Sequence, residues 1–379
     1  MTTQRGLTFV DGAWYAPVGD DVILELAGDA SDRARVLDAL RMLDATAGPL
    51  LFALSYEAGV ALDPRLPRKP RDPRLGPDVL MRPLVLTSAP SPPLGVPRVP
   101  VRAPDDATRA RHLARVGQAK EHLLDGVIYQ ANLAHRIAID PIDHDGGLAF
   151  FLDAIQGGQG PPCAAFVDVP GWGSVISLSP ERFINVDADQ MARAYPIKGT
   201  RARGHSAVED ARLLAELCAS EKDAAEHVMI VDLLRNDLGE LAVAGGVTVE
   251  RLLDVISVKN VHHLESTVAA RLREGVRMRE LLEASAPGGS ITGAPKSSAV
   301  EVIHELEDGP RGLYTGILGV VHQGTLRSSL LIRTWLRPDG AEGSLHVGGA
   351  IVVDSEPAAE WQETLDKAAA FSGPRTGGT

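Results

Sequence analysis

The chain has 379 residues, of which 44% are hydrophobic and 23% charged, so it can bury a large core as one domain or as several smaller ones. Its formal net charge of −12 argues against a nucleic-acid or anionic-membrane partner, and a small anionic substrate would need a local basic pocket. No signal-like apolar segment and no long apolar run is present, so we expect a cytoplasmic protein without a membrane segment. Cys163 and Cys218 lack metal-ligand spacing, which indicates reduced thiols.

Residues 1–62 are expected to form an N-terminal segment of strands and one helix. The sequence pattern predicts strands at 7–10, 22–26 and 50–56, and a helix at 32–42 with Ser31 as its N-cap. Residues 63–104 differ in composition, because twelve of the 26 prolines lie between Pro64 and Pro104. We expect this stretch to be an exposed connector with one strand at 79–86. Residues 105–373 are then the main domain.

A helix and a strand open the main domain. The spacing of apolar residues predicts a helix at 107–125, ended by Gly126, and a strand at 127–136. Alternation places Ile128, Gln130 and Asn132 on one face of that strand. Polar side chains on so apolar a strand need partners, so they face either water or a ligand pocket.

Short strands are predicted along the rest of the domain, at 164–169, 174–178, 183–186, 313–321, 328–336 and 344–353. Glu181 lies in the turn 179–182, and Arg333 interrupts the strand at 328–336. A buried arginine is costly unless a carboxylate pairs with it. Arg333 is therefore a candidate for bidentate capture of a substrate carboxylate.

The segment 195–204 contains the strongest candidate for covalent chemistry, Lys198. The lysine ends an apolar run, Gly199 allows positive φ or close approach of a ligand, and Thr200 adds a hydroxyl beside exposed N–H groups. Burial lowers the pKa of an ammonium, and a neutral amine is a nucleophile. The alternative, which is the commoner case, is a solvated lysine beside two arginines.

Two predicted helices carry acidic pairs. Asp223 and Glu226 share a face of a helix over 222–234, while Glu360 and Glu363 precede Lys367 on one face of a helix that begins near residue 357. Oxygen ligands from two such pairs suit Mg²⁺, which keeps some waters and accepts substrate oxygens. A solvated helix face is the alternative for each pair taken singly.

Between these helices lies a loop of small residues at 286–296, which leads into a helix at 295–307. Pro295 stands at the expected first helical position, and free N–H groups beside Ser290 and Thr292 make a corner that favours an anion. The spacing to Lys296 and the lack of a directly preceding strand differ from a P-loop, so nucleotide binding is not expected.

Together these stretches resemble the chorismate-utilising enzymes over residues 107–371. The motifs, in the order of that family, are YQANL at 129–133, SPERF at 179–183, PIKGT at 196–200, AEH through DLLRND at 225–237, HL at 263–264, the loop at 289–296 and the acidic helix at 354–367. The resemblance implies an α+β fold in which two large antiparallel sheets pack face to face with helices outside.

Two positions indicate a branch of that family. Relatives that add water to chorismate carry a lysine where this chain has Gln130, and anthranilate synthases have alanine in place of Lys198. The resemblance therefore implies the aminodeoxychorismate branch, an amination of the transaminase class. There the lysine attacks C2 of the ring as the 4-hydroxyl departs, and ammonia then enters at C4 and expels the lysine. The product, 4-amino-4-deoxychorismate, precedes p-aminobenzoate and folate.

The resemblance also implies roles for the candidate residues. Glu181 corresponds to the acid/base near the 4-hydroxyl, and Glu226 and Glu363 correspond to Mg²⁺ ligands that Asp223 and Glu360 support. The remaining implied groups are His263 and Thr200 in catalysis and Gln130, Gly199, Arg333, Gly349 and Lys367 in substrate binding.

Further expectations concern a difference from the family's glycine pattern, a partner subunit and two rival functions. Ala350 follows Gly348 and Gly349 where the family has a further glycine, which adds a methyl near the carboxylates, and no motif for tryptophan feedback is found. Neither Cys163 nor Cys218 fits an amidotransferase nucleophile, so a separate glutaminase (glutamine amidotransferase) subunit is expected to supply ammonia. The rival hypotheses are an anthranilate synthase component I and a catalytically silent chorismate-binding subunit.

Overall fold

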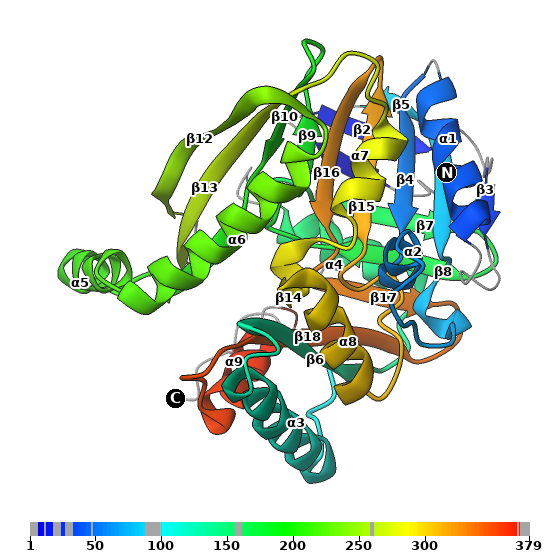
Figure 1. Cartoon of the computed structure of the whole chain (residues 1–379). Coiled ribbons are helices and arrows are strands. Elements are labelled where there is room, and N and C mark those ends of the chain that lie inside the picture. Colours follow the sequence, from blue (N-terminus) through cyan, green and yellow to red (C-terminus); the bar gives the residue numbers. More distant parts are fainter. Residues whose placement is uncertain are drawn as a thin grey trace.

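The computed structural model describes residues 7–10, 13–17, 24–26, 33–46, 48–87, 99, 101–155, 161–257, 261–369 and 371. Two antiparallel sheets occupy the centre of the molecule and helices pack around them (Figure 1). This confirms the predicted α+β arrangement. Within the described residues, no helix is both long and apolar enough to cross a membrane.

Neighbouring strands of the first sheet are antiparallel throughout. Their order is β5 (Val79–Thr87), β2 (Ala13–Pro17), β1 (Leu7–Val10), β7 (Ala165–Val169), β8 (Gly173–Ser177), β17 (Thr334–Pro338), β18 (Gly343–Ile351), β6 (Gln130–Ile139) and β14 (Gly293–Ala294). β18 pairs with β6 along its whole length, from Gly343 opposite Ile139 to Ile351 opposite Ala131. This pair carries the candidate residues Gln130 and Gly349.

The second sheet is also antiparallel and shares β5 with the first. Its order is β12 (Ala242–Ser257), β13 (Val261–Leu272), β10 (Met191–Ala194) end to end with β11 (Ile197–Ala202), β9 (Ile184–Val186), β16 (Thr325–Leu330), β15 (Ile317–His322), β4 (Leu50–Leu54), β5 and β3 (Leu24–Leu26). Because β5 pairs with strands of both sheets, the N-terminal strands belong to the same fold as the main domain.

Several helices begin at polar caps that satisfy free backbone N–H groups. They are α1 (Arg33–Ala45), α2 (Tyr56–Ala61), α3 (Asp106–Leu124), α4 (His144–Ala154), α5 (Ala207–Cys218), α6 (Glu221–Gly239), α7 (Met278–Ser285), α8 (Lys296–Leu306) and α9 (Pro357–Ala369). Side-chain oxygens of Ser55, Asp105, Asp143, Ser206 and Ser220 accept hydrogen bonds from the first turns of α2 to α6.

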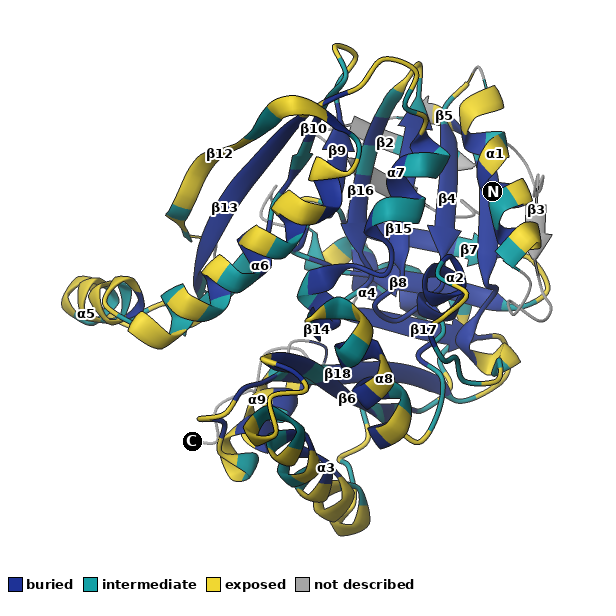
Figure 2. Cartoon of the chain, in the orientation of Figure 1, coloured by how far each residue is buried: buried dark blue, intermediate teal, exposed yellow. Residues whose placement is uncertain are grey.

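The largest apolar core joins strands of the second sheet to α1, α6, α7 and α8. Phe52 of β4 and Leu282 of α7 are fully buried within it, and Val300 of α8 is 1% exposed. Figure 2 shows buried strands between helices whose outer faces are exposed. This core supports α6 and the loop before α8, which carry candidate site residues, from behind.

Several sequence expectations were wrong in detail. The strand predicted at 313–321 begins only at Ile317. The strand predicted at 50–56 ends at Leu54, because Ser55 caps α2. The strand predicted at 328–336 is split into β16 and β17, which lie in different sheets, and Arg333 between them has a φ of 48°. Pro295 is the N-cap of α8 and not its first helical residue.

The connector expected at 63–104 is exposed only in part. Residues 75–82 are buried, and β5 is paired on both sides in the second sheet, with β4 and with β3. A Pro-rich composition suggested an exposed segment, but Pro83 takes part in the pairing with β4. The predicted strand residues 22 and 23 and the predicted cap Ser31 lie outside the described residues.

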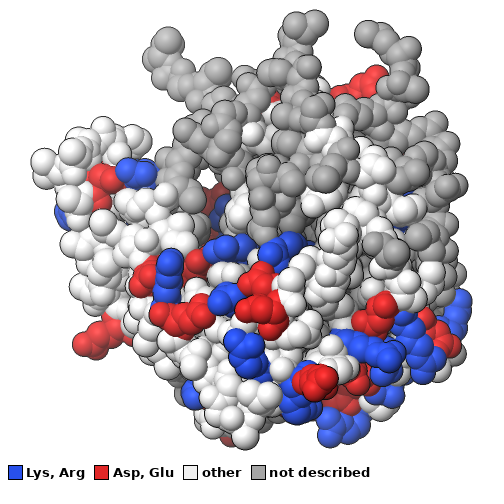
Figure 3. Space-filling model, turned by 90° about the horizontal axis from the view of Figure 1, so that it is seen from above, with Lys and Arg blue, Asp and Glu red and all other residues white. Residues whose placement is uncertain are grey.

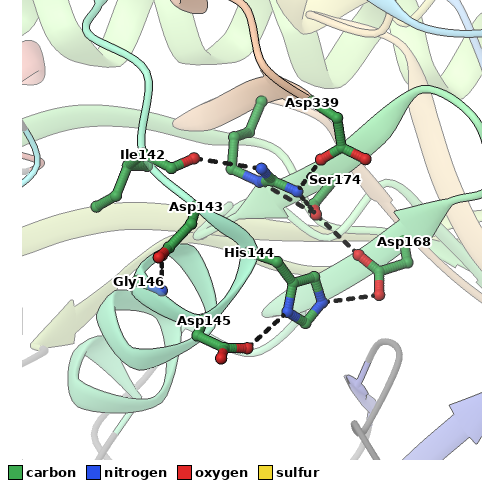
Figure 4. A network of polar contacts seen from close by, with 9 residues as sticks. Ile142, Asp143, His144, Asp145, Gly146, Asp168, Ser174 and Asp339 are labelled. Carbon is green, nitrogen blue, oxygen red and sulfur yellow. Dashed lines mark hydrogen bonds and ion pairs between the residues drawn. The ribbon is translucent and has the colours of Figure 1, made fainter.

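A polar network ties α4 to the first sheet (Figure 4). Asp168 accepts hydrogen bonds from Ser174, at 2.8 Å, and from His144, at 2.9 Å, and Ser174 in turn accepts from Arg337. The serine donates to the carboxylate and not to the histidine. This arrangement anchors the helix and does not form the nucleophile and base pair of a hydrolase.

The surface seen in Figure 3 mixes charges of both signs, with lysine and arginine beside aspartate and glutamate. On this face, lysine and arginine side chains of the described residues lie among acidic ones.

Candidate functional site

A glycine bulge in β11 places Lys198 close to α6. β11 pairs with β13, and the register shifts between Lys198 and Thr200, where Gly199 has a φ of 75°. A Cβ on Gly199 would lie 3.3 Å from the Cβ of Asp223. Glycine is favoured here both for its φ and for the close approach of α6.

Lys198 lies among charged side chains from three other elements. Burial lowers the pKa of its ammonium, an effect that Glu226 of α6 and Glu181 oppose and that Lys367 of α9 adds to. Glu363 of α9 also acts on Lys198. The structure thus brings together side chains from β11, α6, α9 and the turn before β9, as the sequence predicted for these residues.

Glu181 is a buried carboxyl in this group. Its backbone carbonyl accepts a hydrogen bond from the Leu330 N–H at 3.2 Å, which ties the turn to the end of β16. Burial raises the pKa of Glu181, while a hydrogen bond from Ser290 and the charges of Lys198 and Lys367 act in the opposite direction. A carboxyl with a raised pKa retains its proton more readily and can donate it.

The residue after Glu181 fixes the turn. Arg182 pairs with Glu265 of β13 at 2.9 Å, and its guanidinium carbon lies 3.8 Å from the centre of the Tyr195 ring. Tyr195 lies just before β11 in the sequence, and Glu265 lies opposite Ile197 of β11 in the sheet. These contacts therefore hold the turn with Glu181 beside the strand with Lys198.

His263 faces the site as a neutral imidazole. Its Nδ1 lies 2.9 Å from Thr200 Oγ1, and burial, with a smaller effect from Arg333, lowers the pKa of His263 to about 4. Its Nε2 is buried and has no hydrogen-bond partner among the described residues. This leaves one ring nitrogen available to a ligand.

The acidic pairs on α6 and α9 approach each other. Burial raises the pKa of Glu226, and the charges of Asp223 and Glu360 add to the increase. Burial also raises the pKa of Glu360, and Glu363 adds to it. The two helices therefore direct carboxylates toward one region, where the charges of Lys198 and Lys222 act against the increase in the pKa of Glu226.

Protein contacts hold the supporting carboxylates. Asp223 accepts from Arg201 at 2.9 Å, and Glu360 Oε1 accepts from Ser355 at 2.6 Å. Glu360 Oε2 is buried without a hydrogen-bond partner among the described residues. Lys367 donates to Glu363, at 2.7 Å, and to a backbone carbonyl of β18.

The donors suit a cation that keeps water ligands better than one that needs a full protein cage. Among the described residues, no three histidine, cysteine, aspartate or glutamate side chains are grouped closely enough to hold a metal ion. The unpaired Glu360 Oε2 and the mutual repulsion around Glu226 fit Mg²⁺, which is bound through one or two carboxylates, waters and substrate oxygens.

Gly349 of β18 forms the floor under α9. A Cβ at this position would lie 3.1 Å from Glu360 Oε2 and 3.6 Å from Glu363 Oε1. Side chains alternate along a strand, so the Ala350 methyl lies on the face of β18 opposite to Gly349. The methyl expected near the carboxylates therefore points away from them.

Arg333 lies near His263, as its effect on the pKa of that histidine indicates. It occupies the link between β16 and β17, where its backbone carbonyl accepts from the Leu178 N–H. Its guanidinium has no carboxylate partner among the described residues, although burial lowers its pKa. An unpaired, largely desolvated cation is costly, which favours an anionic ligand.

Gln130 is fully buried, and neither its amide oxygen nor its amide nitrogen has a hydrogen-bond partner among the described residues. No contact joins it directly to Lys198. Gln130 pairs with Ala294 of β14, at the end of the small-residue loop. In the same loop, the Ser290 carbonyl accepts from Asn132 and the Ser290 side chain hydrogen-bonds Glu181. Gln130 thus borders the loop side of the site.

Some residues of the site were not predicted from the sequence. Ser290 was placed in an anion-favouring loop but not beside Glu181, and Lys222 acts on both Glu226 and Glu360. A buried ion pair of 2.7 Å between Lys296 and Asp237 fastens the loop to α6. The sequence held a signal for that pair, since both residues belong to the motifs quoted above.

Comparisons with known proteins identify the family. The family profile described as chorismate binding enzyme matches residues 77–373, and the chain belongs to this family. It is 42% identical to aminodeoxychorismate synthase component 1 of Escherichia coli, over 69% of this chain and 56% of that protein. It is 41% identical to an anthranilate synthase component 1 of Haloarcula marismortui, over 68% of this chain and 50% of that protein. The chain thus spans about half the length of these curated relatives.

Solved structures agree on the fold. Anthranilate synthase component I of Streptococcus pneumoniae superposes with a TM-score of 0.74 at 23% identity, covering 97% of this chain and 89% of that one. The menaquinone-specific isochorismate synthase of Escherichia coli gives 0.73 at 18% identity, covering 98% and 89%. At these identities the likeness extends to the fold alone.

Proposed function

We propose that this chain is the chorismate-binding component of an aminodeoxychorismate synthase, which converts chorismate and ammonia to 4-amino-4-deoxychorismate. The observation that carries the proposal is Lys198, a partly buried amine with a lowered pKa that lies near Glu181 and Glu226. Anthranilate synthases, which the chain resembles closely, have alanine at this position. A binding subunit without activity would not need a nucleophile held among acid groups.

The reaction proposed is a substitution in two stages. Lys198 Nζ, in its unprotonated form, forms a bond to C2 of the ring, the two conjugated ring double bonds shift, and the C4–O bond breaks. Glu181, whose pKa burial raises, gives the departing hydroxyl its proton, so water leaves. Ammonia then bonds to C4, the double bond shifts back, and the bond from C2 to Lys198 breaks. The sum consumes one ammonia and releases one water.

His263 and Thr200 are proposed to act beside the ring. The contact of 2.9 Å between them fixes the orientation of the imidazole, and the neutral ring keeps Nε2 free to hydrogen-bond the substrate. Gly199 allows the ring to approach the backbone of β11. Arg333 supplies an unpaired guanidinium for one substrate carboxylate.

Mg²⁺ is proposed to bind at Glu226 and Glu363, with Asp223 and Glu360 as supporting carboxylates. When bound, it would neutralise a carboxylate of chorismate and the surplus negative charge of the two helices. Lys367 holds Glu363 at 2.7 Å and limits its movement. Gly349 leaves the space in which these oxygens meet.

Ammonia is proposed to come from a separate glutaminase subunit and to enter beside Gln130, whose amide is buried and unpaired among the described residues. The relative from Escherichia coli is named component 1, which implies a second component there. Cys218 is exposed at the end of α5 and Cys163 is half-buried. We do not expect either cysteine to act as an amidotransferase nucleophile.

One assay separates the alternatives. The purified chain is incubated with chorismate, Mg²⁺ and an ammonium salt at alkaline pH, and the products are identified by chromatography. We expect 4-amino-4-deoxychorismate. Anthranilate would identify the rival synthase, and no product under conditions where the chain binds chorismate would identify the silent subunit.

A further inference from the structure

Helix α9 presents two different faces to the rest of the protein. Glu360, Glu363 and Lys367 lie toward the proposed site, whereas Trp361 and Thr364 are buried on a side that contacts His135 of β6 and His112 of α3. Residues 363 and 364 are adjacent, so a rotation of the helix about its axis moves both together. Whatever holds Thr364 therefore also sets the direction of Glu363.

One side chain, His135 of β6, holds that buried face. Its Nε2 lies 2.9 Å from Thr364 Oγ1, and its ring stacks on Trp361 with centroids 4.8 Å apart and an interplanar angle of 24°. His135 is 5% exposed. It thus makes both a polar and a ring contact with α9, from a strand that itself pairs with β18 beneath the helix.

The direction of the hydrogen bond between His135 and Thr364 follows from a second hydrogen bond that Thr364 makes. Thr364 Oγ1 donates its proton to the Trp361 carbonyl at 2.8 Å, so it can only accept from His135. His135 must then carry its proton on Nε2, and its Nδ1 has no partner among the described residues. Burial lowers the pKa of His135 to about 3, which keeps this neutral tautomer across the pH range of catalysis.

A second histidine completes the cluster without holding the helix by a hydrogen bond. The His112 ring of α3 meets the His135 ring edge-on at 5.1 Å and lies 5.6 Å from the Trp361 ring. Neither of its nitrogens has a hydrogen-bond partner among the described residues. His112 therefore contributes packing to the same place, which makes it a matched control.

We infer that His135 is a positioning residue for the proposed reaction, which fixes the rotation of α9 through Thr364 and so holds Glu363 toward Glu226. This inference rests on the proposed function of Glu363 as a Mg²⁺ ligand. It assigns a purpose to a histidine that the proposed chemistry does not use. Partners that orient ligands from behind typically change metal affinity 10- to 100-fold when removed.

The test compares variants that remove the hydrogen bond with variants that keep it. His135→Leu and Thr364→Val delete the bond at similar volume, His135→Gln keeps a donor at the same reach, and His112→Leu alters packing alone. Calorimetric Mg²⁺ titration with chorismate, without ammonia, avoids turnover. Hydrogen exchange of the α9 amides reports on the helix without metal or substrate.

We expect His135→Leu and Thr364→Val to weaken Mg²⁺ binding by about 10-fold or more and to speed exchange in α9, with kcat at saturating Mg²⁺ changed less than KM for the metal. His135→Gln should restore both toward the parent chain. Wild-type exchange in α9 for folded His135→Leu would overturn the inference, as would equal effects from His112→Leu. If the parent chain binds no Mg²⁺, the role of Glu363 fails while the exchange data still decide whether His135 positions α9.

Discussion

Two buried polar regions lie on opposite sides of the loop before α8, and they differ in how completely they are paired. In the first, Arg311 donates to Glu307 through Nε and Nη2 and to the backbone carbonyls of Ile291 and Asn132. Glu57 in turn accepts from the Arg311 N–H at 2.7 Å. Arg311 and Glu307 are nearly fully buried, and each has several partners.

The second region, around Lys198, leaves polar atoms unpaired. Gln130, His263 Nε2 and Glu360 Oε2 are buried without hydrogen-bond partners among the described residues, and Arg333 has no carboxylate beside it. Unpaired buried polar atoms also occur elsewhere among the described residues, for example Tyr56 Oη beside Arg311, but those around Lys198 lie with several charged side chains, which favours that region as a ligand site. The first region therefore supports the loop, and the region around Lys198 is the one that we propose binds the substrate.

Replacing the nucleophile should have the largest effect. Lys198→Ala should lower aminodeoxychorismate formation by about 10³-fold or more, because the covalent step is lost, while the melting temperature stays nearly constant. Lys222→Ala serves as a charge control, since this exposed lysine also acts on Glu226. Full activity of Lys198→Ala would leave direct attack by ammonia as the route.

Removing the proposed metal ligands should come next. Glu226→Ala and Glu363→Ala should each abolish Mg²⁺-dependent turnover, because Mg²⁺ held by one or two carboxylates has little affinity to spare. Turnover is measured across a Mg²⁺ series, with excess EDTA as the metal-free control. Undiminished turnover in EDTA would contradict the metal assignment.

Two arginines test the difference between the regions most sharply. Arg311→Met should lower the free energy of unfolding by about 3–5 kcal/mol, because Glu307 is left buried and unpaired. Arg333→Met should leave stability unchanged or slightly raised and should increase KM for chorismate by about 10- to 100-fold. Denaturant unfolding and steady-state kinetics measure the two effects, and similar behaviour of both variants would remove the distinction.

The smallest expected effect is on acid stability. Burial lowers the pKa of His112 to about 4, whereas an unfolded histidine titrates near 6.5. Between these values the unfolded chain binds the extra proton, so stability is lost as pH falls from about 6.5 toward 4, at up to about 1.4 kcal/mol per pH unit for this residue. Unfolding curves at several pH values should show a shallower slope for His112→Leu. An identical slope would mean that His112 is protonated in the folded protein.

Local signals in the sequence predicted many elements well. Caps and periodic apolar residues located α3, α6, α8 and α9, and Gly199 was recognised as a position of positive φ. The split of 328–336 into strands of two sheets was missed, because an apolar run does not reveal which sheet each half joins. The hairpin of β12 and β13 was missed as well, since most of β12 is exposed and lacks the alternation of a half-buried strand.

The candidate site was predictable where one motif carries a role. Lys198, Glu181, Glu226 and Glu363 were each chosen from such a motif, and the structure places these side chains near one another, while their roles stay predictions. Contacts between motifs could not be predicted from the sequence. The hydrogen bond from Ser290 to Glu181 and the contact of His135 with α9 both join residues that are far apart in the chain.

The most direct test of the central claim is mass spectrometry of the chain quenched during reaction with chorismate and Mg²⁺ in the absence of ammonia. The account predicts that the peptide with Lys198 gains the mass of chorismate less one water, and that the adduct disappears when ammonium is added. An unmodified Lys198 peptide in a preparation that goes on to form 4-amino-4-deoxychorismate with ammonium would contradict it.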